Sequence, residues 1–395
     1  MTHYSTEIAI VGGGICGLWL LNILRNAGYE ACLLEQGQLG QAQTLASQGM
    51  IHGGIKYALG GFTTPASETI ASMPAKWQDC IDGTGSLDLQ GLDVLSRDYY
   101  LFSDGALADR VTAFFASKSL RGRVDVIKRQ HYPAAFQSPA FKGSLYRLQD
   151  MVIDTSALLT KLQQKYAEHI YQATVSVKSE NGAVSELQLD NEISRKTGSK
   201  DSISAQRYIF AAGEGNGKLL PSLEFMSLKM QTRPLKQVLV KGNLPQMFAH
   251  AVSLKDANKP RLTITTHSMK DGDQVWYLGG NLAEQGAGMK DADLITKAKQ
   301  ELKALIPWVE QSGLEFRTLD INRAEPTQEN QSRPDFPFTL QTANALVCWP
   351  TKLTLTPMLG DEVLKLLAPP CASNWQRPQL PLASVSPPPW ELAFA

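Results

Sequence analysis

The sequence lacks a net charge, a cysteine motif and a long apolar run. Lys+Arg and Asp+Glu both number 38 among 395 residues. No overall field therefore attracts nucleic acid or an anionic membrane, although these totals do not exclude a local basic patch. The five cysteines include no C-x-x-C pair: Cys16, Cys32, Cys80, Cys348 and Cys371. This spacing argues against a disulfide framework or a metal site and favours a reducing compartment.

Membrane and export signals are also missing. No stretch approaches the roughly 20 consecutive apolar residues that a membrane-spanning helix needs. Residues 1–7 contain no Lys or Arg, and glycines interrupt the apolar stretch that follows, so we expect no secretory signal peptide. We therefore expect a cytoplasmic protein that acts on a small molecule, with peripheral membrane contact left open and the oligomeric state undetermined.

The first 35 residues carry the most specific pattern in the chain. Residues 8–11 are apolar and predict a buried strand, and residues 15–27 predict a helix that Gly28 ends. Residues 31–34 predict a second strand, parallel to the first, with Glu35 at its end. This strand–turn–helix–strand order is the context in which a dinucleotide fingerprint is informative.

Three glycines and one acid complete that fingerprint, with the spacing Gly12-x-Gly14-x-x-Gly17 and then Glu35. Gly12 permits the tight turn, and Gly14 leaves room for a pyrophosphate at the helix N-terminus. Gly17 allows close packing of the helix and the strand, and the Glu35 carboxylate can accept hydrogen bonds from a ribose diol. The free N–H groups and positive dipole end of the helix would hold the phosphates. An ordinary glycine-rich turn would not need the acid.

A second stretch indicates which dinucleotide is bound. Residues 44–57 are rich in Gly and Ser and contain Ile51-His52-Gly53-Gly54. This segment resembles one in the D-amino-acid-oxidase-like superfamily of FAD enzymes, which includes glycine and sarcosine oxidases, glycerol-3-phosphate dehydrogenase and L-2-hydroxyglutarate oxidase. In that family the segment wraps the pyrophosphate and passes along the flavin ring. The resemblance covers nearly the whole chain in order, and it implies FAD as the cofactor.

Two later stretches fit the same resemblance. Ala211-Ala212-Gly213 ends a strand where family members pass close under the pyrophosphate, and Lys352 to Thr354 precede a helix whose N–H groups would face the flavin ring. Either stretch could instead be an ordinary strand end or loop. The cofactor contacts implied are Gly12, Gly14, Ile15, Cys16, Gly17, Glu35, Gln36, Thr44, Ser47, Gln48, Gly49, Met50, Val175, Ala212, Gly213, Lys352, Leu353 and Thr354.

The resemblance and the length of the chain together imply an α/β fold with two lobes. The first is a Rossmann-like FAD-binding lobe with a doubly wound, mostly parallel sheet, formed by residues 1–65, 145–229 and 335–368. The second is an α+β substrate lobe on a mixed or antiparallel sheet, formed by residues 66–144 and 230–334. Residues 369–395 are rich in proline and would form a tail or strap.

Periodicity and turn signals predict local elements within these lobes. The helices are expected at 65–80, 106–120, 158–166, 292–305 and 358–367, a hairpin at 171–189 around Asn181-Gly182, and an exposed loop at 191–204. Asp154 or Ser156 is expected to serve as the N-cap of the helix that follows.

The resemblance implies oxidation of a C–H bond next to an amine or a hydroxyl, in a small amino acid, amine or hydroxy acid. Hydride would pass to flavin N5, and the electrons would then go to oxygen or a quinone. His52 is the candidate for proton transfer, because an imidazole changes charge near neutral pH. Covalent attachment of the flavin and a purely structural contact are the alternatives for His52. Lys56 and Tyr57, which follow it, could face the substrate or solvent.

The substrate site departs from the family pattern. Members that oxidise amino or hydroxy acids carry a Gly-x-Arg-Pro motif whose arginine clamps a carboxylate. At the similar place this chain has Glu325 before Pro326, so Arg323 or Arg333 would have to substitute. An acid at this position favours an amine or a neutral alcohol.

Tyr277 is the third catalytic candidate, beside His52 and Arg323. Alternation along its strand sends Trp276 and Tyr277 to opposite faces, so at most one of them faces the substrate.

Other functions remain compatible with the fingerprint alone. One is an NAD(P)H-dependent flavin monooxygenase, although Pro357 precedes Gly360-Asp361 rather than following it as in such enzymes. Another is a non-catalytic FAD-binding subunit or assembly factor. A plain NAD dehydrogenase would explain the first 35 residues but not residues 44–54.

Overall fold

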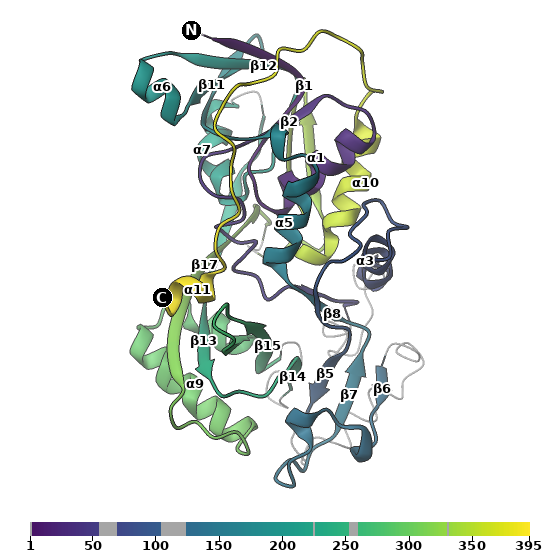
Figure 1. Cartoon of the computed structure of the whole chain (residues 1–395), viewed down its shortest axis with the longest axis vertical. Helices are drawn as coiled ribbons and strands as arrows, with labels where there is room; N and C mark the ends of the chain where they lie inside the picture. The colour runs from purple at the N-terminus through teal and green to yellow at the C-terminus, as the bar shows by residue number, and fades with distance from the viewer. Residues whose placement is uncertain (1, 55–68, 104–123, 224–225, 253–259, 330–331) are drawn as a thin grey trace.

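The computed structural model describes residues 2–54, 69–103, 124–223, 226–252, 260–329 and 332–395. Figure 1 shows an elongated molecule with one sheet near each end of its long axis and long strands running between them. The N-terminus lies at one end, and the C-terminus lies beside the other sheet.

The first sheet is mostly parallel and contains eight strands among the described residues. Its main order is β10-β11-β12-β1-β2-β9, and β19 pairs with β12 and carries β18 at its side. The strands are β1 (His3–Val11), β2 (Ala31–Glu35), β9 (Ile170–Gln172), β10 (Thr174–Glu180), β11 (Ala183–Asp190), β12 (Asp201–Phe210), β18 (Phe338–Thr342) and β19 (Ala345–Trp349). The pairs β1–β2, β1–β12, β2–β9 and β12–β19 are parallel.

Both faces of this sheet are covered. Ile8 and Leu33 point into a core shared with α1 (Ile15–Asn26), α5 (Thr155–Lys165) and α10 (Thr356–Leu366). Figure 1 shows these three helices together on one side of the sheet. On the other face, Val11 and Leu34 pack in a separate core with residues of the β10–β11 hairpin and of β18 and β19.

The second sheet contains eight strands in the described part of the chain, in the order β17-β13-β16-β15-β14-β5-β7-β6. All neighbours are antiparallel except β14 and β5. The strands are β5 (Tyr99–Phe102), β6 (Val124–Val126), β7 (Leu145–Leu148), β13 (Met230–Gly242), β14 (Ala249–Ala251), β15 (Leu262–Ser268), β16 (Gln274–Gly279) and β17 (Glu315–Pro326). Helices α8 (Asn281–Gly286) and α9 (Asp291–Leu305) pack on one face with Trp276 and Leu278.

Smaller elements join the two sheets. A three-stranded sheet contains β3 (Met50–Ile51), β8 (Met151–Ile153) and β4 (Val94–Ser96). Further helices whose full bounds lie in the described residues are α3 (Met73–Ile81), α6 (Glu192–Thr197), α7 (Asn216–Leu219) and α11 (Pro389–Ala393). The predicted fold class, a doubly wound lobe with a second lobe on a mixed sheet, is confirmed.

Several local predictions differ from the structure. Residues 191–204 are not a loop: Asn191 caps α6 by accepting from Ile193 N and Ser194 N, and β12 begins at Asp201. A polar helix without an apolar stripe gives no periodic signal, which is why the pattern missed it. Within the helix expected at 65–80, the described residues are helical at 69–71 and, after a turn at Ser72, in α3, and the helix expected at 106–120 lies outside the described residues.

One predicted lobe boundary also differs from the strand pairing in the structure. Strand β7, which we assigned to the FAD-binding lobe, pairs with β5 and β6 in the second sheet. The chain therefore returns to the first lobe only after Leu148.

Candidate functional site

The fingerprint glycines lie where three backbone segments meet. Gly12 has a φ of +110°, and a Cβ on it would lie 2.5 Å from the Ala212 Cα at the end of β12. A Cβ on Gly17 would collide with the Gly12 carbonyl oxygen. The backbones of β1, β12 and α1 thus approach too closely for any side chain, as the fingerprint predicts.

Glu35 lies at the end of β2 and is held by backbone donors. Its Oε2 accepts from Gly13 N at 2.6 Å, and its Oε1 accepts from Gly37 N at 2.9 Å. A carboxylate oxygen has a second lone pair, so Glu35 can still accept from a ligand hydroxyl.

Two hydroxyls lie beside the N-terminus of α1. Thr44 Oγ1 accepts from Ile15 N at 3.0 Å. The Ser47 Oγ is buried and has no hydrogen-bond partner among the described residues. Buried polar atoms rarely stay unpaired, so Ser47 is available to a ligand in this place.

A cleft of about 470 Å³ opens along these residues. It is lined by most of the predicted cofactor contacts: Gly12, Gly14, Ile15, Cys16, Glu35, Gln36, Thr44, Ser47, Ala212, Gly213, Lys352 and Leu353. A volume of this size is typical of small-molecule sites.

The same cleft is lined by residues that sequence reasoning missed. They include Gln38, Gly40, Gln41, Ala42 and Gln43 after Glu35, Glu214, Gly215 and Lys218 after Gly213, and Asn322 and Ala324 of β17. The first two groups directly follow predicted contacts, so their position in the chain was a usable signal. Asn322 and Ala324 come from the second sheet, whose crossing over the cleft no local pattern reveals.

Other predicted cofactor contacts support the cleft without lining it. Gln48 Nε2 donates to the Tyr277 carbonyl at 2.8 Å, and this bond joins residues 44–54 to β16. Gly49 has a φ of +70°, and a Cβ there would collide with the Ile153 carbonyl oxygen. Met50 lies in β3, paired with Val152 of β8.

Val175 is not among the residues that line the cleft. It lies on β10, opposite Leu189 of β11, and is partly buried. It lies off the cleft wall, as Gln48, Gly49 and Met50 do.

His52 is buried beside residues 352–354, which the sequence predicts to precede the helix facing the flavin ring. Its side chain is almost fully enclosed, and its backbone oxygen accepts from Thr354 Oγ1 at 3.2 Å. The next residue, Gly53, donates its N–H to Asp150 Oδ1 at 2.8 Å. Two predicted cofactor segments, 44–54 and 352–354, are thus joined directly at His52. Lys56 and Tyr57 lie outside the described residues.

Tyr277 contacts residues 36–50, which supply much of the cleft wall and are called the cofactor segment below. Its hydroxyl donates to the Ala46 carbonyl at 2.9 Å, and burial raises its pKa well above the ordinary value. Trp276 points to the opposite face of the sheet, into the core with α9, as alternation predicts. Because the Tyr277 hydroxyl is already bonded to backbone, this geometry does not present it to a substrate.

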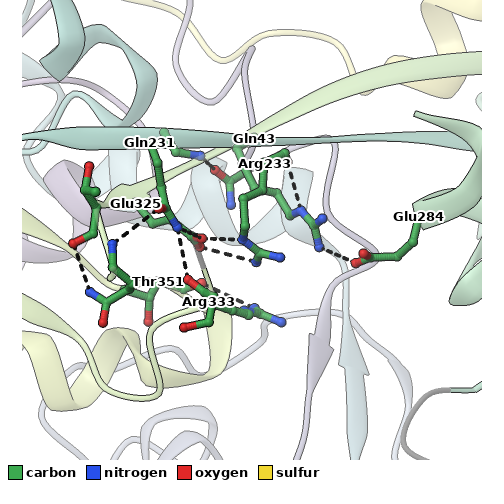
Figure 2. Close-up of polar contacts among 12 residues, drawn as sticks. Gln43, Gln231, Arg233, Glu284, Glu325, Arg333 and Thr351 are labelled. Atoms are coloured by element: carbon green, nitrogen blue, oxygen red, sulfur yellow. Dashed lines mark hydrogen bonds and ion pairs between the residues drawn. The ribbon is translucent and has the colours of Figure 1, made fainter. Parts of the chain in front are cut away.

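Figure 2 shows how the charged groups near the expected carboxylate clamp are paired. Both Glu325 oxygens contact the Arg233 guanidinium, and Glu325 Oε1 also accepts from Gln231 Nε2 at 3.0 Å. Arg323 Nη1 donates to Glu284 at 2.8 Å, and its Nε donates to the Arg233 carbonyl. Burial lowers the pKa of Arg323, against the opposing effect of Glu284. Arg323, predicted as a free clamp, is therefore already paired.

Arg333 lies near this cluster, beside Thr351 (Figure 2). Its Nη2 donates to the Thr351 carbonyl at 3.3 Å, and Thr351 lines the cleft. Gln43 links the cluster to the cofactor segment, since its Oε1 accepts from Ala324 N at 3.1 Å. The charge cluster and the cleft thus share a wall.

The cleft fits FAD by its construction. Gly12 and Gly14 lie on its wall, the N-terminus of α1 opens into it, and Glu35 and Ser47 offer hydrogen-bonding atoms. No group of His, Cys, Asp and Glu in the described part of the chain could hold a metal ion. No helix within the described ranges is long and apolar enough to cross a membrane.

Comparison with known proteins identifies the family. The sequence pattern of the FAD dependent oxidoreductase (DAO) family matches residues 7–318. A protein of Pseudomonas aeruginosa named as a probable FAD-dependent oxidoreductase is 41% identical over 396 residues, which cover 99% of each chain. A crystal structure of an FAD dependent oxidoreductase from Pseudomonas aeruginosa superposes with a TM-score of 0.84 and 37% identity over 100% of both chains.

A more distant likeness shows the fold alone. Glycine oxidase from Geobacillus kaustophilus superposes with a TM-score of 0.64 at 16% identity, over 96% of this chain and 99% of that one. The extent of the first two matches, over nearly the whole length of each chain, goes beyond fold. The chain belongs to the DAO family of FAD-dependent oxidoreductases, and its cofactor is FAD.

Proposed function

We propose that this enzyme oxidises a C–H bond next to an amine or a neutral alcohol, with His52 as the proton acceptor. The observation that carries the proposal is the direct bond between the loop at 352–354 and His52. It supports a position for His52 beside the reacting end of the cofactor.

The two lobes have separate parts in this proposal. Gly12, Gly14 and Glu35 would hold the adenosine and pyrophosphate end, and Lys352 to Thr354 would hold the ring end. The second sheet, with residues of β15 and β16, would cover the substrate. When bound, FAD supplies the hydride acceptor and delivers the electrons to oxygen or a quinone.

His52 would take the proton from the substrate nitrogen or hydroxyl on an imidazole nitrogen. The buried surroundings of its side chain exclude water from this transfer. The bond from Gly53 N to Asp150 fixes the turn that follows His52, and so limits the movement of the imidazole.

The charge pairs near Glu325 support the choice of substrate. Arg233 and Arg323 each have a carboxylate partner. A substrate carboxylate that bound Arg233 or Arg323 would have to displace Glu325 or Glu284 from a partly buried pair. An amine or a neutral alcohol needs no such exchange.

The test is anaerobic mixing of the purified enzyme with amines, neutral alcohols, α-amino acids and α-hydroxy acids, followed by flavin absorbance. We expect amines or neutral alcohols to bleach the flavin faster than the acids of matched size. Addition of oxygen or of a quinone to the reduced enzyme then identifies the acceptor. Faster bleaching by the α-amino acids would contradict the substrate assignment.

His52→Ala tests the proton acceptor in the same experiment. We expect the rate of flavin reduction to fall by about 10²- to 10⁴-fold, with the FAD content unchanged. His3→Ala, at an exposed histidine of β1, is the matched control and should leave the rate unchanged. An unchanged rate and pH profile in His52→Ala would remove His52 from the chemistry.

A further inference from the structure

The last 27 residues, 369–395, form a C-terminal strap that runs along the molecule from one sheet to the other (Figure 1). The strap starts after α10, passes beside β1 and β9, and ends in α11 next to β13 and β17. It lies beyond residues 7–318, which the family pattern matches. Its role is therefore not given by the family assignment.

The strap first contacts the cofactor segment, residues 36–50, at Leu39. Leu39 N donates to the Ser384 carbonyl at 2.8 Å, and Ser386 N donates to the Leu39 carbonyl at 3.1 Å. The Leu39 side chain fills the space where a Cβ on Gly13 would be, and Gly40 N donates to the Gly13 carbonyl. The strap thus holds Leu39 against the fingerprint turn.

The strap then anchors in the second sheet through Trp390. This side chain is 2% exposed and packs with Leu239 and Tyr277. Its ring lies 4.3 Å from the His267 ring at an interplanar angle of 31°, and 6.1 Å from the Tyr277 ring. The backbone of Lys270 adds a bond, since its N–H donates to Glu391 Oε1 at 2.8 Å.

The two rings that contact Trp390, Tyr277 and His267, are both connected to the cofactor segment through hydrogen bonds. Tyr277 donates its hydroxyl to the Ala46 carbonyl. His267 Nε2 lies 3.0 Å from Thr265 Oγ1, which in turn accepts from Gln48 Nε2 at 3.4 Å. The contacts of Trp390 therefore extend to Ala46 and Gln48 in the C-terminal part of the cofactor segment, whereas Leu39 lies in its N-terminal part.

We propose that the C-terminal strap is a latch for FAD, and that Trp390 is its positioning residue. Residues 36–50 supply much of the cleft wall, so opening of this segment would remove that wall from FAD and favour its release. The strap contacts both ends of the segment, directly at Leu39 and through Tyr277 and His267 at Ala46 and Gln48. Local opening is limited by the contacts that it breaks, so these contacts slow FAD release.

The experiment measures FAD release from full-length holoenzyme after dilution, by the rise in flavin fluorescence. Trp390→Ala should speed release at least tenfold, measured well below the melting temperature of its apoprotein, which loss of this buried ring lowers. Trp390→Phe, which keeps an aromatic ring over His267, should restore most of the retention. Leu392→Ala is the matched control, because Leu392 lies on the same helix and is 62% exposed. It should release FAD at the wild-type rate.

Tyr277→Phe tests the path from the strap to the segment. It keeps the ring under Trp390 and removes the bond to Ala46, so release should again be faster. If Trp390→Ala does not fold, the Tyr277→Phe release rate decides between the outcomes. Release within twofold of wild type in Tyr277→Phe and in any folded Trp390→Ala, or equal acceleration in Leu392→Ala, would overturn the proposal. Because no substrate is present, the result does not depend on the proposed reaction.

Discussion

Glu325 is a buried carboxylate whose partner comes from a neighbouring strand. Strands β13 and β17 pair so that Gln231 lies opposite Glu325 and Arg233 lies opposite Arg323. The Glu325 side chain is only 3% exposed, and Arg233 and Gln231 together satisfy its oxygens. Burial of such a carboxylate costs free energy unless partners of this kind satisfy its oxygens.

This pairing gives a stability prediction. Arg233→Met should lower the free energy of unfolding by about 3–5 kcal/mol, because it leaves the Glu325 charge buried without its partner. Urea unfolding of the two proteins measures the difference. The double variant with Glu325→Gln should recover part of the loss.

The matched control is an exposed ion pair. Lys196→Met breaks the pair between Lys196 and Glu192, both more than 70% exposed. It should leave the urea midpoint unchanged. A loss in Arg233→Met no larger than in Lys196→Met would show that the buried pair contributes little.

The sequence identified Glu325 and Arg323 of this cluster, but not their partners. The departure at Glu325 and the presence of Arg323 follow from the local motif. The partner of Glu325 lies 92 positions away in the chain. Without the register of β13 on β17, no pattern could assign Arg233 to Glu325 or Glu284 to Arg323.

At the scale of the element, the junction of β1, α1 and β12 is the most constrained part of the fold. Gly17→Ala should abolish FAD binding or weaken it severely, because the new Cβ would collide with the Gly12 carbonyl and force α1 away from the sheet. Flavin content after purification and FAD titration of the apoprotein measure the effect.

Gly288→Ala serves as the control for that variant. A Cβ on Gly288 would meet no atom within 4 Å, and its backbone is not left-handed. FAD binding should match wild type. If Gly17→Ala also bound FAD normally, close approach of helix and strand would not be the reason for glycine at position 17.

Elements with strong local chemistry were predicted well. Asn181 and Gly182 have φ values of 53° and 76°, as the hairpin turn requires. Asp154 Oδ1 caps α5 by accepting from two backbone N–H groups. The helix α6, by contrast, is short and polar, and its capping box alone was too weak a signal.

At the scale of the whole molecule, the sequence order of the segments indicated two lobes, but not the contacts between them. Asn322 and Ala324 reach the cleft from the second sheet, and Trp390 reaches that sheet from the chain's end. Such contacts depend on how long strands twist and cross, which periodicity does not encode. The prolines of the strap predicted an extended path and left its destination open.

The place where the strap meets the second sheet gives a prediction for pH. His267 is enclosed by Trp390, Tyr277 and Thr265, and burial lowers its pKa to about 3 from 6.5. The folded protein thus keeps this imidazole neutral, whereas the unfolded chain binds a proton below about pH 6.5. The contribution of neutral His267 to the free energy of unfolding is therefore fully present above about pH 6.5, and it is lost progressively as pH falls toward 3. At pH 5 the loss from His267 alone should be about 2 kcal/mol.

Urea unfolding at pH 7 and pH 5 measures this loss. In His267→Gln, which has no titratable group at this position, the difference between the two pH values should be smaller than in wild type by that amount. His3→Gln, at an exposed histidine, should keep the wild-type difference. Because Trp390 covers the imidazole, a state in which the strap has undocked exposes His267, and this state binds a proton below about pH 6.5 while the docked state stays neutral. FAD release from wild type should then accelerate as pH falls below 6.5, and this acceleration should be smaller in His267→Gln.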